Sequence, residues 1–247
     1  MRSTSLPIKY LLIDIDNCLV RYDDNYVPYV TDVIVDAVLQ LDEKARRVFN
    51  GDRDLVRKLA DEFYLKYGQS VLGFAEEYHF PISDLCDLYH DQLDPDKCVN
   101  PNDNDMARLR RFKEWILGSV RMGRIENYVA FTQSTKSWAE KILFDKCELY
   151  GIFNNQNIIT SEQYDHAFKH RDRRPYDVAM ARMQATPDEC VIIDDSKSVL
   201  RFAFNTIGMK TCLITHGNKI AEQDRGYLSG SADHIGNAPI ALTALVR

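Results

Sequence analysis

From about residue 103 onward the chain alternates short apolar runs with longer amphipathic segments, and this alternation restricts the fold more than any other feature. The runs are almost continuously apolar: "NYVAFTQ", "NIITSE", "CVIIDD" and "KTCLIT". Runs this short and this apolar are typical of strands buried on both faces, as in parallel sheets. The segments between them have helical periodicity, and such helices cover both faces of a parallel sheet. We therefore expect an α/β fold with a doubly wound parallel sheet.

The part of the chain before residue 103 has a different character. Residues 9–16, "KYLLIDID", predict one more buried strand. Residues 28–92 instead show apolar spacings of three and four, interrupted at Pro81, which is typical of helices. Residues 94–105 are polar and contain two prolines, so they predict a linker. The pattern indicates a helical unit inserted after the first strand.

This insert divides the chain into two predicted domains. Residues 1–20 and 103–247 form the predicted α/β core domain, and residues 21–102 form the predicted α-helical cap domain. Near the end of the core, residues 218–232 have the composition of a loop, and residues 238–246 predict a short closing helix.

Charge and composition limit the kind of partner. The net charge is −6, which argues against a nucleic-acid polymer but not against a small anionic substrate. The six cysteines are scattered without a Cys-x-x-Cys pair, so we expect no zinc ribbon and a reducing compartment. No run of eighteen apolar residues and no signal-peptide core is found, so we expect no membrane association. These features predict a cytoplasmic protein.

Polar side chains stand where the predicted strands end. Asp14 and Asp16 follow the first strand, Thr132 ends "NYVAFT", and Asp194 and Asp195 end "VIIDD". Ligands of open parallel sheets bind at the carboxyl ends of the strands. We therefore expect these side chains to meet in one crevice.

Several carboxylates in one crevice need a reason, because like charges repel and raise one another's pKa. If the backbone stays extended beyond Asp14, the side chains of Asp14 and Asp16 point to the same face. Either aspartate motif alone most often ends a strand and enters a turn, but their joint occurrence is far more specific. Mg²⁺ would relieve the repulsion by binding carboxylates together with a substrate phosphate. One carboxylate can then attack phosphorus, and another can protonate the leaving oxygen.

These residues resemble the motifs of the haloacid dehalogenase superfamily of phosphatases. The similarity is greater to the pyrimidine 5′-nucleotidase-like branch, which has a helical cap after the first motif. "DIDNCL" is similar to the opening motif of that branch, "LKYGQSVLGFAEEYHF" to its cap, and "HDQLDPDKCVNPNDNDMARLRRF" to its return from cap to core. The similarity extends from about Tyr10 to the C-terminal helix.

The resemblance implies a role for each matching residue. Asp14 would be the nucleophile that forms an aspartyl-phosphate, and Asp16 the general acid and base. Thr132 would hydrogen-bond the phosphate. Asp194 and Asp195 would hold Mg²⁺ together with Asp14 and the backbone carbonyl of Asp16. The second acid also argues against a true dehalogenase, whose pattern resembles this one without it.

Two positions depart from the family pattern. Gln133 and Ser134 follow the threonine where asparagine is usual, and we assign Gln133 to phosphate binding. The third motif normally has a lysine directly before proline, but here the sequence is "AFKHRDRRPYDVAM". Lys169 is our choice for the cation that neutralises nucleophile and phosphate, and Arg171 and Arg173 remain alternatives.

Cap residues that would select a substrate are harder to identify. Aromatic and histidine side chains at helical spacing belong more often to a core than to a ligand site; those considered are Tyr64, Tyr67, Phe74, Tyr78 and His79. The predicted function is a Mg²⁺-dependent phosphomonoester hydrolase that acts on a small phosphorylated metabolite, with a nucleoside 5′-monophosphate implied by resemblance alone. The alternatives are a phosphatase of phosphosugars or other small metabolites, and an impaired phosphate-binding scaffold.

Overall fold

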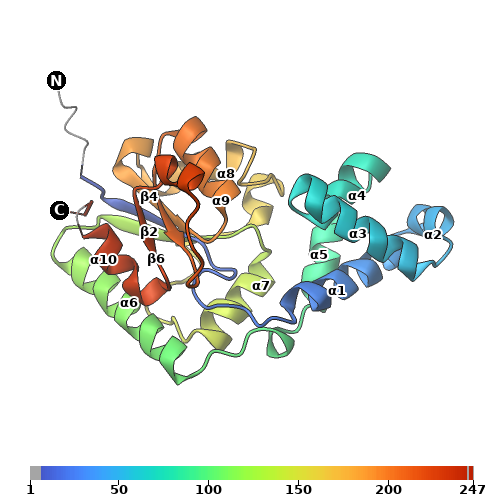
Figure 1. Cartoon of the computed structure of the whole chain (residues 1–247), viewed down its shortest axis with the longest axis horizontal. Coiled ribbons are helices and arrows are strands. Elements are labelled where there is room, and N and C mark those ends of the chain that lie inside the picture. Colours follow the sequence, from blue (N-terminus) through green and yellow to red (C-terminus); the bar gives the residue numbers. More distant parts are fainter. Residues whose placement is uncertain (1–6, 244, 247) are drawn as a thin grey trace.

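A computed structural model describes residues 7–243 and 245–246. Its core is a six-stranded, all-parallel sheet in the order β3-β2-β1-β4-β5-β6 (Figure 1). The strands are β1 Tyr10–Ile13, β2 Asn127–Phe131, β3 Ile158–Ile159, β4 Cys190–Asp194, β5 Lys210–Ile214 and β6 Gly230–Ala232. The predicted doubly wound α/β fold is therefore confirmed.

Helices cover both faces of this sheet. Three of them share one apolar cluster with the strands: α6 Asp103–Arg121, α7 Lys136–Glu140 and α10 Ala238–Leu242. Two others share the cluster on the opposite face: α8 Arg174–Met183 and α9 Lys197–Phe202. Alternation along each strand explains the division, because Leu11 and Ile13 enter the first cluster and Tyr10 and Leu12 the second.

The register of the central strands sets the position of the candidate site. Ile13 of β1 is paired with Ala130 of β2 on one side and with Ile193 of β4 on the other. The residues that follow these three positions therefore lie at the same edge of the sheet. Asp14 directly follows β1 and Asp194 is the last residue of β4, so the register brings the two carboxylates together.

A helical unit stands beside the core (Figure 1). Its helices are α1 Tyr26–Gln40, α2 Glu43–Phe49, α3 Arg53–Tyr67, α4 Ser70–Tyr78 and α5 Ile82–Gln92. They enclose an apolar cluster of their own, which we call the cap cluster. Gly73 allows α4 to approach α3, because a Cβ there would lie only 2.1 Å from Cγ of Phe63.

The chain enters and leaves this helical unit through two adjacent segments. The backbone N–H of Asp23 donates to the carbonyl of Cys98 at 3.0 Å. The amide of Asn25 donates to the carbonyl of Lys97 at 2.9 Å. The second segment contains a short 3₁₀ turn, Pro95–Lys97, and ends at Asn102, which caps α6.

Several elements differ from the sequence prediction. Gly230–Ala232 forms the edge strand β6 inside the predicted loop 218–232, because "GSA" offers no apolar run to detect and pairs only along β5. The predicted helix over 238–246 ends at Leu242, and residue 244 lies outside the described residues. Helices α7 and α9 each continue directly into a π-helical segment, at Lys141–Lys146 and Ala203–Ile207.

The remaining short 3₁₀ turns lie in connections of the core: Ser161–Tyr164, Pro187–Glu189, Glu222–Tyr227 and Ile235–Asn237. All six cysteines are buried and unpaired. Among the residues that the structure describes, no helix has both the length and the apolar character needed to cross a bilayer.

Candidate active site

Three carboxylates converge at the carboxyl ends of β1 and β4. Asp14, Asp194 and Asp195 each offer one oxygen, and these oxygens lie within 4.8 Å of one another. Burial, and then the charge of Asp194, raise the pKa of Asp14 well above its ordinary value. The same two causes raise the pKa of Asp195 to about 7. An acidic group this compact and this buried needs a compensating cation.

The donor set fits a hard divalent cation. It consists of carboxylate oxygens alone, which is the ligand type that Mg²⁺ prefers, and it leaves no soft ligand such as a thiolate in the group. Asp195 is also oriented from outside, because the Asn17 amide donates to its Oδ2 at 2.7 Å. Asn17 adopts a left-handed backbone conformation with φ of 52°, which turns the chain away from the sheet after β1.

Lys169 supplies a buried cation at the same place. Its Nζ donates to Oδ1 of Asp14 at 2.5 Å, to Oδ2 of Asp194 at 3.0 Å and to the carbonyl of Phe131 at 3.1 Å. Burial alone would lower the pKa of Lys169, but the two carboxylates outweigh it and raise that pKa well above its ordinary value. The ammonium therefore stays charged against the predicted nucleophile.

The segment that carries Lys169 is fastened to the core by side chains. The Gln133 amide donates from Nε2 to the carbonyl of Ala167 at 2.9 Å and accepts at Oε1 from the backbone N–H of Lys169 at 3.0 Å. The Tyr176 hydroxyl donates to the carbonyl of Lys169 at 2.8 Å. The assignment of Gln133 to phosphate binding stays a prediction, and in the structure its amide holds the Lys169 segment in place.

The two alternative cations of the third motif lie elsewhere. Arg171 pairs with Glu76 of α4 at 2.7 Å, and Arg173 pairs with Asp177 at 3.0 Å. Both arginines are about half exposed, whereas Lys169 is only 4% exposed. Geometry thus favours Lys169 among the three candidates.

Asp16 does not join the group of three carboxylates. The strand ends at Ile13, and a turn begins at Asp16. Instead Asp16 accepts four hydrogen bonds. Oδ1 accepts from the Tyr22 hydroxyl at 2.8 Å and the Trp138 indole at 2.6 Å. Oδ2 accepts from the hydroxyls of Thr132 at 2.6 Å and Ser134 at 2.8 Å.

Thr132, assigned to the phosphate from the sequence, is fully buried and its hydroxyl is directed at Asp16. The backbone N–H of Ser134 donates to that hydroxyl at 3.0 Å, so the loop after β2 folds around the threonine. Thr132 and Ser134 thereby hold the predicted acid from the β2 side, and the group of donors around Asp16 comes from three separate segments.

Sequence reasoning missed four residues that position these side chains: Asn17, Tyr22, Trp138 and His216. His216, in a left-handed conformation after β5, contacts the carbonyl of Asn17 through Nε2. Nothing in the local pattern marks any of them, because each acts across 100 residues or more or through a turn. Only the fold brings them next to the two aspartates.

The aromatic residues considered in the cap pack in its core or lie at its surface, as expected from their helical spacing. Phe74 and Tyr78 pack in the cap cluster, Tyr67 donates to Glu77, and Tyr64 and His79 are exposed. The negative charge of Asp16 acts on the pKa of three other side chains, which belong to α1 and α5: Tyr26, Tyr89 and His90. Burial raises the pKa of both tyrosines well above its ordinary value, and Asp16 adds to this. Tyr89 and His90 also pack ring on ring, with centroids 3.9 Å apart.

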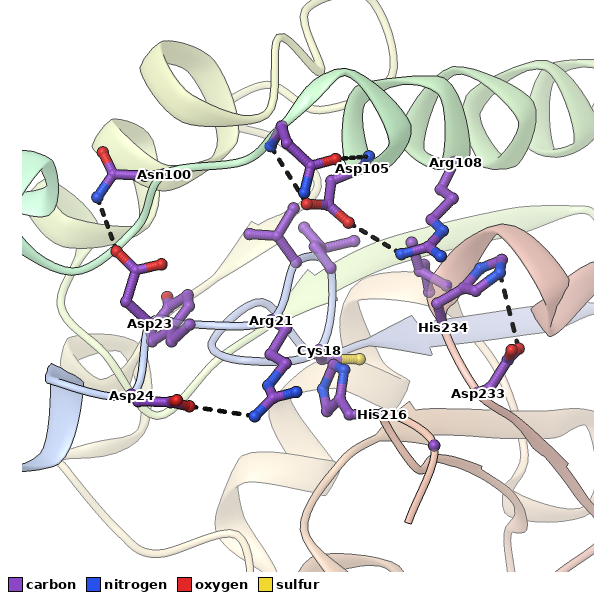
Figure 2. A pocket seen from close by; sticks show the side chains of 16 residues that line it. Cys18, Arg21, Asp23, Asp24, Asn100, Asp105, Arg108, His216, Asp233 and His234 are labelled. Atoms are coloured by element: carbon purple, nitrogen blue, oxygen red, sulfur yellow. Dashed lines mark hydrogen bonds and ion pairs between the residues drawn. The ribbon is translucent and has the colours of Figure 1, made fainter.

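A separate cavity of about 550 Å³ lies behind the loop that follows β1 (Figure 2). Its lining includes none of the four aspartates or Lys169. Two arginines in it are paired with acids of the lining, Arg21 with Asp24 and Arg108 with Asp105. The cavity is therefore distinct from the candidate active site, although Tyr22 and His216 border both.

The sheet order, the covering helices and the inserted helical unit form a Rossmann-like fold that is similar to the fold of the haloacid dehalogenase superfamily. Solved structures of that superfamily match nearly the whole chain. The HAD phosphatase from Thermococcus onnurineus has a TM-score of 0.57 at 16% identity, covering 97% of this chain and 100% of that one. CbbY from Rhodobacter sphaeroides, in complex with phosphate, has a TM-score of 0.54 at 15% identity, covering 96% and 99%.

Dehalogenases share the fold as well. The L-2-haloacid dehalogenase from Xanthobacter autotrophicus has a TM-score of 0.52 at 13% identity, covering 96% of this chain and 99% of that one. No protein-family model and no curated protein matches the sequence. The superfamily fold expected from the motifs is thus found, whereas the nucleotidase-like branch stays a prediction.

Proposed function

We propose that this protein is a Mg²⁺-dependent phosphomonoester hydrolase that acts through an aspartyl-phosphate on Asp14. One observation carries the proposal: the Asp14 carboxylate pairs with the Lys169 ammonium and lies beside the carboxylates of buried Asp194 and half-buried Asp195. Lys169 and a bound Mg²⁺ together would offset the charge that a phosphate dianion brings into this acidic site.

Each residue has a defined task in this proposal. Asp14 attacks phosphorus and forms a new O–P bond, while the bond from phosphorus to the leaving oxygen breaks. Asp16 gives its proton to that leaving oxygen. Asp16 then accepts a proton from water as the water attacks phosphorus and the Asp14–phosphate bond breaks. Asp14, Asp194, Asp195 and the Asp16 carbonyl would hold Mg²⁺, which draws phosphate and nucleophile together when it is bound.

The dehalogenase alternative shares the nucleophile but not the other requirements. A halide leaves as a stable anion and needs no proton, whereas an alkoxide leaving from phosphorus does. A monoanionic haloacid also needs less positive charge than a phosphate dianion. Asp16 with its four donors and the pair Asp194 and Asp195 therefore favour phosphoryl transfer.

For the substrate we propose a small phosphorylated metabolite, with a nucleoside 5′-monophosphate as the first choice. The nucleotide rests on the resemblance of the cap and return segments to the nucleotidase-like branch. Phosphosugars and other small phosphate esters are the alternatives within the same chemistry. The net charge of −6 supports a small substrate over a nucleic-acid polymer.

One set of assays tests the proposal. Phosphate release is measured with Mg²⁺ on p-nitrophenyl phosphate, 5′-mononucleotides and sugar phosphates, and halide release on 2-haloacids. Asp14→Asn is the blank for both. We expect phosphate release that this variant lacks. Halide release without phosphate release would establish the dehalogenase, and phosphate binding without any turnover would establish the scaffold.

A further inference from the structure

One residue of the core belongs to the hydrophobic core of the cap. Phe168 lies in the segment between β3 and α8, yet it is only 4% exposed and its ring is buried in the cap cluster. Figure 1 shows the end of the core that precedes α8 facing α4. A cleft of about 330 Å³ runs along this contact, and Leu72, Phe80 and Ile82 of the cap share its lining with Phe168.

Phe168 directly precedes the cation of the candidate active site. Its ring is buried in the cap cluster, whereas the Lys169 side chain reaches Asp14 and Asp194 in the core. The side chains of two adjacent residues are thus buried in two different parts of the protein, Phe168 in the cap and Lys169 in the core. Arg171 adds a second link to the cap through its 2.7 Å ion pair with Glu76, and its guanidinium lies 5.6 Å from the Phe168 ring centre.

The opposite side of the segment is held by the core. The Gln133 amide donates to the carbonyl of Ala167 and accepts from the N–H of Lys169, and the Tyr176 hydroxyl donates to the Lys169 carbonyl. The backbone around Lys169 therefore rests on core hydrogen bonds on one side and on cap packing on the other. Because Phe168 and Lys169 share one peptide unit, a shift of the ring displaces the ammonium as well.

We propose that Phe168 is a positioning residue that makes the placement of Lys169 depend on the docked cap. The inference rests on the proposed function for its catalytic meaning, since Lys169 acts there on Asp14 and phosphate. With the ring seated in the cap cluster, Lys169 Nζ lies at hydrogen-bond distance from both carboxylates. With the ring released, the segment loses its cap anchor and Lys169 leaves that position. Docking of the cap thus completes the catalytic site.

The test compares two phenylalanines of the same cluster. Phe168→Ala removes the anchor beside Lys169. Phe49→Ala is the matched control, because Phe49 is 2% exposed in the cap cluster but packs on Phe74, Tyr78 and Phe80. Phe168→Leu is the conservative variant that keeps an apolar anchor. Circular dichroism and thermal melting establish that each variant is folded at the assay temperature.

The first readout does not require turnover. Folded proteins are treated briefly with acetic anhydride, and acetylation of each lysine is measured by mass spectrometry, with exposed Lys58 as the internal reference. We expect Lys169 to be protected in the wild type, in Phe49→Ala and in Phe168→Leu. In Phe168→Ala its acetylation should rise by about 10-fold or more, because the segment opens locally.

The second readout is kinetic. Phe168→Ala should lower kcat by up to about 10²-fold, since a displacement near 1 Å at a catalytic group can cost that much. Phe168→Leu should recover most of the rate, and Phe49→Ala should keep it. Protection of Lys169 and normal kcat in a folded Phe168→Ala would overturn the inference. If the wild type hydrolyses no phosphate ester, the proposed function fails, while acetylation still decides whether the cap places Lys169.

Discussion

The indole Nε1 of Trp138 donates to Oδ1 of Asp16 at 2.6 Å. An indole N–H can only donate, so Oδ1 must keep a lone pair directed at Trp138. The other donors to Asp16 are the hydroxyls of Tyr22, Thr132 and Ser134, which can turn from donors into acceptors. The structure therefore assigns to Trp138 the orientation of the predicted general acid.

Replacement of the Trp138 indole tests this assignment. Trp138→Phe keeps an aromatic ring in the core but removes the donor, so Asp16 loses the bond that fixes its orientation. A hydrogen bond to a charged group is worth about 1.5–3 kcal/mol, which predicts a loss of roughly 10- to 100-fold in turnover. The loss should be greater for alkyl than for aryl phosphates, because aryl leaving groups need less protonation. Trp115→Phe in α6 is the control, and equal losses in both variants would contradict the assignment.

Removal of Lys169 should lower turnover sharply. Lys169→Ala deletes the cation between Asp14 and Asp194, and a preorganised charge of this kind is worth roughly 3 to 4 kcal/mol in the transition state. We expect kcat to fall by about 10²- to 10³-fold. Arg173→Ala is the control, because its exposed pair with Asp177 contributes little. A larger loss in Arg173→Ala than in Lys169→Ala would show that the third motif was assigned wrongly.

The two acids of the first motif should fail in different ways. Asp14→Asn lacks the attacking oxygen charge, so neither product nor phosphoenzyme should form. Asp16→Asn keeps the nucleophile, so an aspartyl-phosphate should form slowly and break down slowly. Rapid-quench experiments with ³²P-labelled substrate distinguish the two variants. Wild-type turnover in Asp14→Asn would exclude the covalent route.

Metal dependence is the fourth prediction. Chelator-treated protein should be inactive, and Mg²⁺ should restore activity. Ca²⁺ should bind but support little turnover, because its longer and more variable ligand distances misplace the phosphate. Mg²⁺ should also raise the melting temperature of the wild type by relieving repulsion among the three carboxylates. Asp195→Asn should lose most of that rise, and a full rise in this variant would place the metal elsewhere.

The contribution of His90 to the stability of the protein should fall in mild acid. Its Nδ1 lies 2.8 Å from the Cys86 carbonyl. Burial lowers the pKa of His90 to about 4, although the negative charges of Asp16 and Glu162 act to raise it. His166 lowers this pKa further. An unfolded histidine titrates near about 6.5. Between these values the unfolded chain binds a proton that native His90 does not, so the contribution of His90 to the free energy of unfolding falls by about 3 kcal/mol through this window.

Urea unfolding between pH 4 and pH 7.5 measures this dependence. The free energy of unfolding of the wild type, taken relative to that of His90→Gln, should decrease as the pH falls from about 6.5 toward 4, because the variant has no titrating ring there. Asp195, whose pKa is raised to about 7, has the opposite effect on stability, but this effect is the same in both proteins. His79→Gln, at an exposed position, should follow the wild type. Identical slopes for all three proteins would mean that other groups cause the acid sensitivity.

The fold could be predicted because its strands carry their own signal. "KYLLI" and "CVIID" are apolar on both faces, so each reads as a central parallel strand, and the acids that follow them meet at one edge. Strand β6 could not be predicted, because an edge strand of Gly-Ser-Ala needs no apolar face. Sequence signals of burial find the middle of a sheet and miss its margins.

The candidate site divides in the same way. Asp14, Asp194 and Asp195 follow from strand ends, and the place of Lys169 depends on contacts that no local pattern reveals. The orientation of Asp16 was not predictable, because it depends on where β1 stops and on donors far away in the chain. The hydrogen bonds of Gln133 to Ala167 and Lys169 were not predictable, because the family pattern gives a residue type at that position and not the direction of its side chain.

The insert leaves and rejoins the core at adjacent points, where the N–H of Asp23 meets the carbonyl of Cys98. All six strands are paired without any residue of the insert. The core could therefore exchange this helical unit for another during evolution while its strands stay unchanged. Such an exchange would preserve the chemistry of the strand ends. The new unit would, however, have to provide an apolar pocket in which the Phe168 ring is buried.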